Sequence, residues 1–387
     1  MKKNFLRHCT GICLGLFLLV GQAQAAQSDP GDGPSLVPGY TLNSIRALRD
    51  RIERTGLAFN SIQSIDKPQF VSVSDASLSM DDDEIVFIVE YPEGITRIYP
   101  QRIMVWHEVL NDTLPAPTPQ NASRYAGSDP AARQYTIAYS PLSGSVSAFR
   151  SVAGKFPSTF GVTGDLINAN SVLYDRISHS LWCHMLGICF DGPLEGRRME
   201  RIQVLWATWK GTKIRYMGKA EVLSRSTGIR RPYGRDPYGS YLEPDSYYGN
   251  TSIVNRVSFV DKRLHPKTRI LGLECDALYA ALQVDKVKEQ QVVNFSVGIT
   301  PLVALYDAEI NAVRVFDRRM DADLNAQPID FIIFEGRFTD AASRSIWNPD
   351  GLCTYGKYRD KRLTPVFTLD AMWMSWAAFH RSSPIFP

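Results

Sequence analysis

Long apolar runs are scarce in this sequence. The apolar run from about Ile12 to Val20 is too short to anchor the chain in a bilayer, and no run of about 20 apolar residues occurs downstream. Basic residues precede this run, and the small-residue pattern AQA, ending at Ala25, follows it. This is the order of a secretory signal peptide. We therefore expect cleavage after Ala25 and a soluble mature chain that is exported to the periplasm or secreted.

Net charge is also nearly absent. The chain has 43 basic and 40 acidic residues, and the expected signal peptide holds three of the basic residues and none of the acidic ones. The mature chain is therefore balanced, with 40 of each. This balance gives no reason to expect nucleic acid or an anionic membrane as a partner. We expect an unidentified small ligand or another exported protein instead.

Several motifs that identify enzymes are missing. The sequence has no Gly-Lys-Ser/Thr phosphate loop, no dinucleotide fingerprint and no G-x-S-x-G elbow. His107 and Glu108 begin an H-E pair, but Asn111 stands where a zinc-peptidase helix needs its second histidine. No resident cofactor is therefore expected from motifs.

Cysteine is sparse. Two of the six cysteines leave with the signal peptide, and the even number that remains allows disulfides in an oxidising compartment, with three possible pairings. The remaining cysteines are Cys183, Cys189, Cys275 and Cys353.

The segment CHMLGIC, residues 183–189, allows two interpretations. Gly187 gives a point at which the chain can fold back, so we expect a disulfide between Cys183 and Cys189. Alternatively, Cys183, His184 and Cys189 form a compact group of soft-metal ligands that His107 joins from a distance, suited to zinc or copper.

The chain contains an internal repeat. Both copies keep the order of a tyrosine and a phenylalanine around a turn, an aspartate before a Ser-x-Trp pattern, a Gly-x-Cys and a pair of tryptophans, which predicts a duplication. The matching segments are 139–149 with 306–316, 174–182 with 339–347, 187–189 with 351–353, and 206–209 with 373–376.

Each copy mixes strand and helix patterns. Residues 85–91 alternate at period two with apolar residues on both faces, which predicts a strand covered on both sides, and residues 270–275 match them. Residues 202–209 and 369–376 have apolar residues at helical spacing, with Thr368 as a possible N-cap. We expect a β-rich α+β fold of two tandem homologous domains, each a sheet-based unit ending in an amphipathic helix.

The expected domain boundaries follow from composition. A lead-in at 26–60 follows the signal peptide, the first repeat domain covers 61–223 and the second, diverged one covers 261–387. Between them, residues 224–260 form a linker rich in Tyr, Gly and Pro. Its tyrosines either form an aromatic binding surface or pack across the seam between the domains.

His107 and Asn111 are candidate catalytic residues. Pro100 suits the first turn of a helix, whose apolar stripe would place His107 at its edge and Asn111 one turn on. The imidazole is either an acid or base or, more commonly, a core histidine bonded to a nearby backbone group. The second copy has Gln290 in place of His107 and keeps Asn294 in place of Asn111.

Ser140 and Ser143 of the stretch YSPLSG are further candidates. A serine nucleophile needs a histidine base within reach, whereas Ser and Pro commonly build turns, so the turn interpretation is favoured. Asp175 is shared with the second copy, as Asp340. A duplicated aspartate favours a structural turn over catalysis, because one active site needs no duplicate.

Several longer stretches resemble the bacterial family catalogued as domain of unknown function 3179. They are PQRIMVWHEVLND, YSPLSG, FGVTGDLINANSVLYDRISHSLW, GPLEGRRME, YGRDPYGSY and WMSWAAFH, and the likeness covers roughly Ile65 to His380. The resemblance implies kinship and no particular reaction. It also implies that Ser140 and Ser143 replace the two cysteines of a Cys-Pro-Leu-Cys turn, and serine hydroxyls do not supply the thiol chemistry of that turn.

Two functions follow from these patterns. The favoured one is a non-enzymatic exported protein that binds a ligand or partner in a groove between the two copies or around the turn at His107. The alternative is a metal-dependent or thiol-redox enzyme centred on His107 with Cys183, His184 and Cys189.

Overall fold

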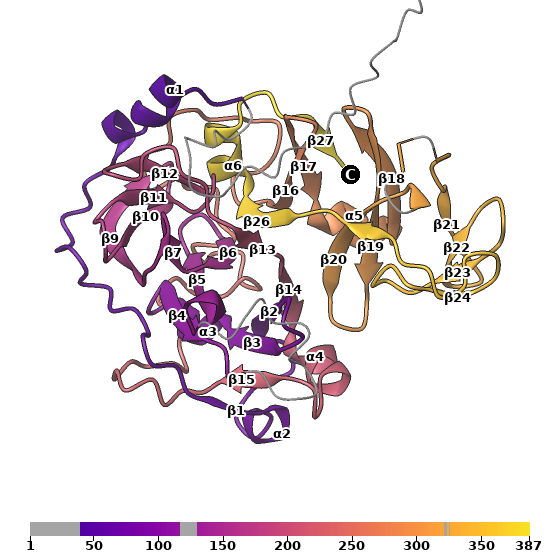
Figure 1. Cartoon of the computed structure of the whole chain (residues 1–387), viewed down its shortest axis with the longest axis horizontal. Coiled ribbons are helices and arrows are strands. Elements are labelled where there is room, and N and C mark those ends of the chain that lie inside the picture. The colour runs from indigo at the N-terminus through magenta and orange to yellow at the C-terminus, as the bar shows by residue number, and fades with distance from the viewer. Residues whose placement is uncertain (1–38, 117–129, 321–322, 325) are drawn as a thin grey trace, which may run out of the picture. The chain divides into compact units, whose positions relative to one another are not determined.

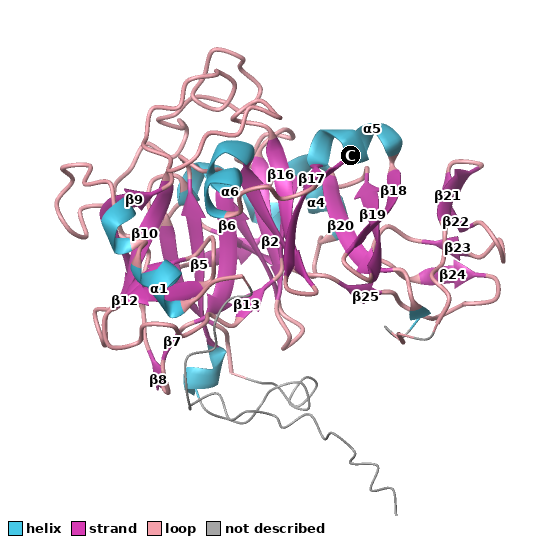
Figure 2. Ribbon diagram, turned by 90° about the horizontal axis from the view of Figure 1, so that it is seen from above, coloured by secondary structure: helices cyan, strands magenta, loops and turns pink. Residues whose placement is uncertain are grey.

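The computed structural model describes residues 39–116, 130–320, 323–324 and 326–387. The expected signal peptide and residues 26–38 of the expected lead-in therefore lie outside the described residues. Strands dominate the described chain and form several separate sheets, which confirms the β-rich α+β prediction (Figures 1 and 2). No helix among the described residues has the length and apolar character needed to cross a membrane.

The N-terminal half of the described chain contains three main sheets. A five-stranded sheet has the order β1-β15-β3-β2-β14, and two four-stranded sheets have the orders β13-β6-β5-β4 and β12-β11-β10-β9. Their bounds are β1 Phe70–Ser72, β2 Ile85–Glu90, β3 Thr96–Pro100, β4 Val109–Thr113, β5 Gln134–Ser140, β6 Ser145–Arg150, β9 Phe160–Ile167, β10 Asn170–Asp175, β11 Leu181–Cys183, β12 Ile188–Asp191, β13 Arg201–Ile202, β14 Val204–Thr208 and β15 Glu221–Leu223; β7 Val152–Ala153 and β8 Phe156–Pro157 form a small hairpin.

The C-terminal half contains three further sheets, with the orders β26-β16-β17-β27, β18-β19-β20-β25 and β21-β22-β23-β24 (Figure 1). Their bounds are β16 Arg269–Cys275, β17 Leu278–Gln283, β18 Val292–Val297, β19 Thr300–Asp307, β20 Ala312–Asp317, β21 Phe331–Phe334, β22 Arg337–Asp340, β23 Ile346–Trp347, β24 Cys353–Tyr355, β25 Thr364–Pro365, β26 Thr368–Met372 and β27 Ile385–Phe386.

The helices are short. The α-helices are α1 Leu42–Arg46, α2 Val73–Ala76, α3 Gln101–Met104, α4 Trp209–Arg215, α5 Val284–Gln290 and α6 Trp373–Phe379, and the 3-10 helices are η1 Arg49–Arg51 and η3 Pro130–Arg133.

The strands expected at 85–91 and 270–275 are confirmed as β2 and β16. The expected terminal helices occur in both halves but begin later than predicted. Residues 204–208 and 368–372 form β14 and β26, and α4 and α6 start only at Trp209 and Trp373. Thr368 therefore opens a strand and caps no helix. The apolar residues at helical spacing were misleading because both faces of β14 and β26 are covered, and a strand covered on both faces carries no alternation.

The helix expected from Pro100 to Asn111 is also wrong beyond its first turn. Helix α3 ends at Met104, and Asn111 lies on β4, which pairs along its whole length with β5. Glu108 adopts a φ of 56°, outside the helical region, and so redirects the chain into the strand.

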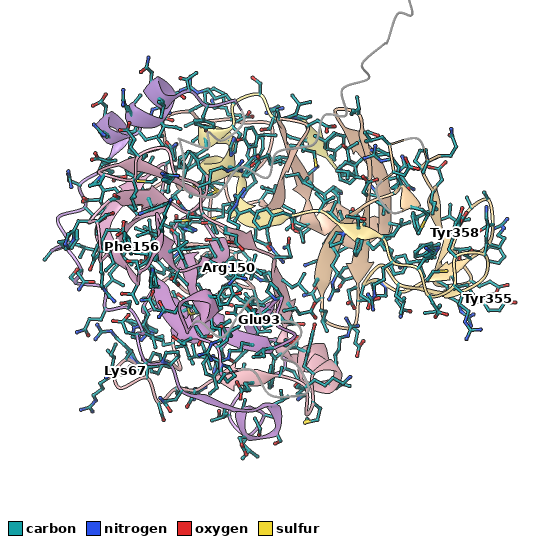
Figure 3. The ribbon with its side chains drawn as sticks, viewed as in Figure 1. Lys67, Glu93, Arg150, Phe156, Tyr355 and Tyr358 are labelled. Carbon is teal, nitrogen blue, oxygen red and sulfur yellow. The ribbon has the colours of Figure 1, made fainter. Side chains whose placement is uncertain are left out.

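Side chains from distant segments share cores. Ile310 and Ala312, at the β19–β20 turn, pack with Val86 and Trp209 of the N-terminal half. The N-terminal and C-terminal halves are thus in direct contact through apolar side chains. Polar contacts also join sheets within the N-terminal half. Arg150 Nη2 of β6 lies 3.5 Å from Glu93 Oε1 in the β2–β3 turn (Figure 3).

Candidate functional site

The serine turn, residues 140–144, connects β5 to β6 and is buried except at Leu142, which is half-buried. Ser140 Oγ accepts a hydrogen bond of 3.1 Å from the backbone N–H of Ser171 and lies 2.9 Å from Ser171 Oγ. Ser171 in turn donates its hydroxyl proton to Glu108 Oε2 at 2.6 Å. Burial raises the pKa of Glu108 to about 7, because a charged carboxylate is poorly solvated there. Ser140 therefore belongs to a satisfied chain of polar groups.

The other serine, Ser143, belongs to a second buried group around Asn170. Its hydroxyl lies 2.8 Å from that of Ser145, and the Asn170 amide reaches both hydroxyls and His184 Nε2 at 2.8–3.0 Å. Ser147 Oγ lies 3.0 Å from His184 Nδ1. Burial lowers the pKa of His184 to about 3, so the ring is neutral at pH 7, accepts at Nε2 and donates from Nδ1. The histidine near the turn thus bonds Ser147 and Asn170, and neither Ser140 nor Ser143 has it as a base.

Tyrosines of the linker cover the serine turn. The Tyr247 hydroxyl donates to the carbonyl of Leu142 at 2.6 Å, and the Tyr241 hydroxyl lies 3.0 Å from that of Tyr139. Tyr241 and Tyr248 stack with their ring centroids 3.8 Å apart. The tyrosines of the linker are therefore used in packing, and a substrate has no direct path to the serine hydroxyls.

His107 is likewise occupied at both nitrogens. Nδ1 lies 2.6 Å from the carbonyl oxygen of Gln63, and Nε2 lies 2.7 Å from the hydroxyl of Tyr233. Burial lowers the pKa of His107, which keeps the ring neutral, so Nδ1 donates and Nε2 accepts. This is the arrangement of a core histidine.

Asn111 and Asp175 hold local structure. Asn111 exchanges hydrogen bonds with the backbone of Phe160, at 2.9 Å in both directions. Asp175 accepts from the backbone N–H groups of Ile177 and Ser178, and the indole of Trp182 donates to its second oxygen at 3.0 Å. These bonds leave little capacity for a reacting group.

The expected Cys183–Cys189 disulfide is not formed in the structure, where Cys183, Cys189, Cys275 and Cys353 are all free thiols. In the β11–β12 hairpin, Cys183 pairs across from Ile188, whereas Cys189 pairs across from Trp182. Neighbouring positions of a strand point to opposite faces, so the two thiols enter different apolar clusters.

The four expected metal ligands are not brought together. Cys183 and Cys189 face opposite sides of their hairpin, His107 bonds Gln63 and Tyr233, and His184 bonds Ser147 and Asn170. In the described part of the chain, no group of three or more His, Cys, Asp or Glu side chains has the arrangement of a metal site.

A groove of about 1120 Å³ lies beside strand β20, lined from both halves of the chain. The N-terminal half contributes Leu205 of β14 and residues at the end of α4, and the C-terminal half contributes the β20 residues from Val313 to Phe316. Apolar side chains such as Phe338 and Val366 line it together with charged ones.

The charged residues that line the groove balance one another, and several of them form ion pairs. Its lining includes four basic residues (Arg215, Lys219, Arg314 and Arg362) and four acidic ones (Glu90, Asp307, Glu309 and Asp350). Buried Asp307 accepts from Arg314 at 2.7 Å and from both terminal nitrogens of Arg215. Burial lowers the pKa of Arg215, but its hydrogen bonds to Asp307 and Glu309 raise it overall.

The sequence patterns did not single out the groove. Its residues come from segments more than 270 positions apart, from Glu90 to Thr368, and each alone reads as an ordinary strand or turn residue. The sequence pointed to this region solely through the expectation of a groove between the two copies.

The sheets and the satisfied polar clusters define a β-rich protein with a groove lined from both halves of the chain. The chain belongs to the family described as protein of unknown function (DUF3179), whose model matches residues 60–383. Comparison with curated proteins and with solved structures gave no match.

Proposed function

We propose that this chain is an exported ligand-binding protein and that the groove beside β20 is its binding site. The groove itself carries the proposal. Its volume of about 1120 Å³ is slightly above the range of typical ligand sites, and its lining combines apolar and charged side chains. The surroundings of His107, the other place considered for a ligand, are filled by Gln63 and Tyr233.

Export rests on the N-terminal 25 residues, whose basic, apolar and small-residue segments follow the order of a secretory signal. The periplasm or the medium is the proposed location. A ligand-binding role suits either compartment, because it needs no nucleotide or redox supply.

An internal duplication is supported by matching contacts. Asn294 exchanges hydrogen bonds with the backbone of Phe331 as Asn111 does with Phe160. Asp340 accepts from the N–H groups at positions 342 and 343 as Asp175 does from those at 177 and 178. In this proposal the groove arises where the two copies meet.

The metal-dependent or redox enzyme is the weaker proposal. Burial raises the pKa of Cys183 and Cys189 to about 12, so neither is a thiolate nucleophile at neutral pH. The separation of the two thiols and the bonded histidines argue in the same direction.

A ligand screen with a blocked groove tests the proposal. The mature protein is heated with a defined panel of oligosaccharides, amino acids, nucleotides, fatty acids and a pool of random peptides. We expect at least one panel member to raise Tm in the wild type and to lose this effect in Ile333→Trp, which fills the groove.

The matched control is Ile299→Trp, which adds the same side chain at an exposed turn outside the groove. This variant is expected to respond to the ligand as the wild type does. A panel that shifts no Tm, or shifts it equally in all three proteins, contradicts the groove as the binding site.

A further inference from the structure

The small sheet β21–β24 has one buried face and one open face. Phe338 and Trp347 are directly opposed on β22 and β23, and both pack in a buried apolar cluster. Ile346 alternates with Trp347 and therefore lies on the other face, as does Tyr355, which is directly opposed to it. Phe334 lies there too, because its neighbour on β21 is opposed to Phe338. On this face Phe334 is 47% and Tyr355 is 67% exposed, and the sheet lies at the edge of the molecule (Figures 1 and 2).

Basic side chains accompany the exposed rings. Arg337 is directly opposed to Phe334 on the open face, and the guanidinium carbon of Arg344 lies 4.9 Å from the centre of the Phe334 ring. Neither arginine forms an ion pair with any residue that the structure describes. Arg359, in the loop after β24, lies 3.8 Å from Asp360, but both side chains are exposed and such a pair stabilises little. The open face therefore combines apolar rings with positive charge.

The first copy contains the same loop with different charges. Asp191 ends β12 as Tyr355 ends β24, and each is opposed to the residue before the tryptophan that both copies share. Glu195 and Arg359 each donate their backbone N–H to the carbonyl of the glycine three positions earlier, at 3.1 and 3.2 Å. Two carboxylates in the first copy are thus replaced by a tyrosine and an arginine in the second. The side chain of Glu195 is 13% exposed, whereas that of Arg359 is 71% exposed.

A segment of the chain covers the loop in the first copy. Arg46 of α1 lies with its Nε 2.6 Å from Glu195 Oε1, and Arg49 of η1 lies 2.8 Å from Asp191 Oδ1. Ile45 of α1 packs in one apolar cluster with residues of β12, and Figure 1 shows the helix beside that strand. This face of the first sheet therefore binds a short polypeptide segment whose arginines match its carboxylates.

We propose that the open face of β21–β24 binds an acidic segment of another polypeptide, as the matching face of the first copy binds α1 and η1. The change from two carboxylates to Tyr355 and Arg359 requires carboxylates in the partner, and the exposed rings require apolar side chains beside them. A hollow of about 600 Å³, lined in part by Arg337, Ile346 and Tyr355, has room for such side chains. This surface is additional to the groove beside β20, and its occupation does not depend on the proposed function.

A peptide library based on the segment that covers the first copy tests the charge of the partner. Residues 41–52 are displayed on phage with positions 46, 49 and 51, all arginine in this chain, randomised, and the library is selected on the mature protein. We expect Asp and Glu to be enriched at these positions. The synthetic peptide with glutamate at all three should bind at least about tenfold more tightly than the natural sequence.

A double variant reverses the expected preference. Tyr355→Asp with Arg359→Glu gives the second loop the acidic residues of the first, and both positions are exposed, so we expect the fold to be kept. The acidic peptide should bind this variant at least about tenfold more weakly, and the natural arginine sequence should bind it more tightly than the acidic one. The matched control is Phe156→Asp with Lys155→Glu, which removes an exposed ring and reverses an exposed charge across the molecule from Tyr355 (Figure 3).

The outcomes separate this inference from the proposed function. If selection enriches no acidic residue, or if both double variants bind the acidic peptide equally, the acidic partner is wrong. If vesicles of phosphatidylglycerol bind to the open face and the peptides do not, the face binds lipid and the polypeptide partner is wrong. Ile333→Trp should bind the acidic peptide as the wild type does, and loss of binding there would place the peptide in the groove beside β20.

Discussion

At the scale of single residues, Glu108 combines a buried carboxyl group with a left-handed backbone conformation. It lies buried at the corner between α3 and β4 with a φ of 56°, and its carboxylate receives a 2.6 Å hydrogen bond from Ser171. The backbone contributes to holding this corner, because the carbonyl of Glu108 accepts from the N–H of Tyr139 at 2.7 Å. The corner is therefore a fixed part of the fold.

Glu108→Gln is expected to change how stability depends on pH. The pKa of the Glu108 carboxyl is raised from 4.5 to about 7 in the folded chain, so the folded state holds a proton that the unfolded state has lost. This contribution is present below pH 4.5 and is lost as pH rises to about 7, amounting to roughly 3 kcal/mol. Glutamine does not titrate, so the variant loses less stability over this range.

Urea unfolding at several pH values between about 4.5 and 8 measures the effect. Glu243→Gln, at an exposed position in the linker, is the control and should follow the wild type. Parallel pH profiles for the wild type and Glu108→Gln would show that the carboxyl titrates normally.

At the scale of elements, close packing between α4 and the β19–β20 turn joins the two halves beside the groove. A Cβ atom on Gly211 of α4 would lie 1.6 Å from the carbonyl oxygen of Glu309. The backbone N–H of Thr208 donates to the carbonyl of Ile310 at 2.9 Å. Only glycine allows the helix to approach the turn this closely.

Gly211→Ala is expected to destabilise the protein by about 1–3 kcal/mol, because a backbone carbonyl cannot move aside easily. Alanine otherwise favours a helix, so a loss reports the clash. The midpoint of urea unfolding measures it. Gly234→Ala, where a Cβ meets nothing within 4 Å, is the control. A stability equal to or above that of the wild type would place the turn farther from α4.

At the scale of the whole molecule, the same exported protein can be used to test signal-peptide cleavage and the state of the cysteine thiols. We expect the exported chain to begin at Ala26, which removes two of the six cysteines. Intact mass gives the first residue. Thiol titration of the denatured, unreduced protein should give four thiols per chain, since Cys183, Cys189, Cys275 and Cys353 are free. Two thiols per chain would instead indicate one disulfide. A mass that retains Cys9 and Cys13 would contradict the expected cleavage.

The sequence by itself determined the β-rich fold class, the strands β2 and β16 and the family. Hydrophobic periodicity and the order of motifs are properties of the chain itself, so they can be recognised without the tertiary structure. The resemblance was specific because its motifs span nearly the whole match.

Tertiary structure decided the rest. Residues 204–208, within the segment with helical spacing, form β14 because β2 pairs with all five of them. The Cys183–Cys189 disulfide failed because strand alternation places the thiols on opposite faces, which spacing alone does not reveal. The groove depends on segments such as Leu205 and Val313 meeting in space, and their contact is not encoded in any local pattern.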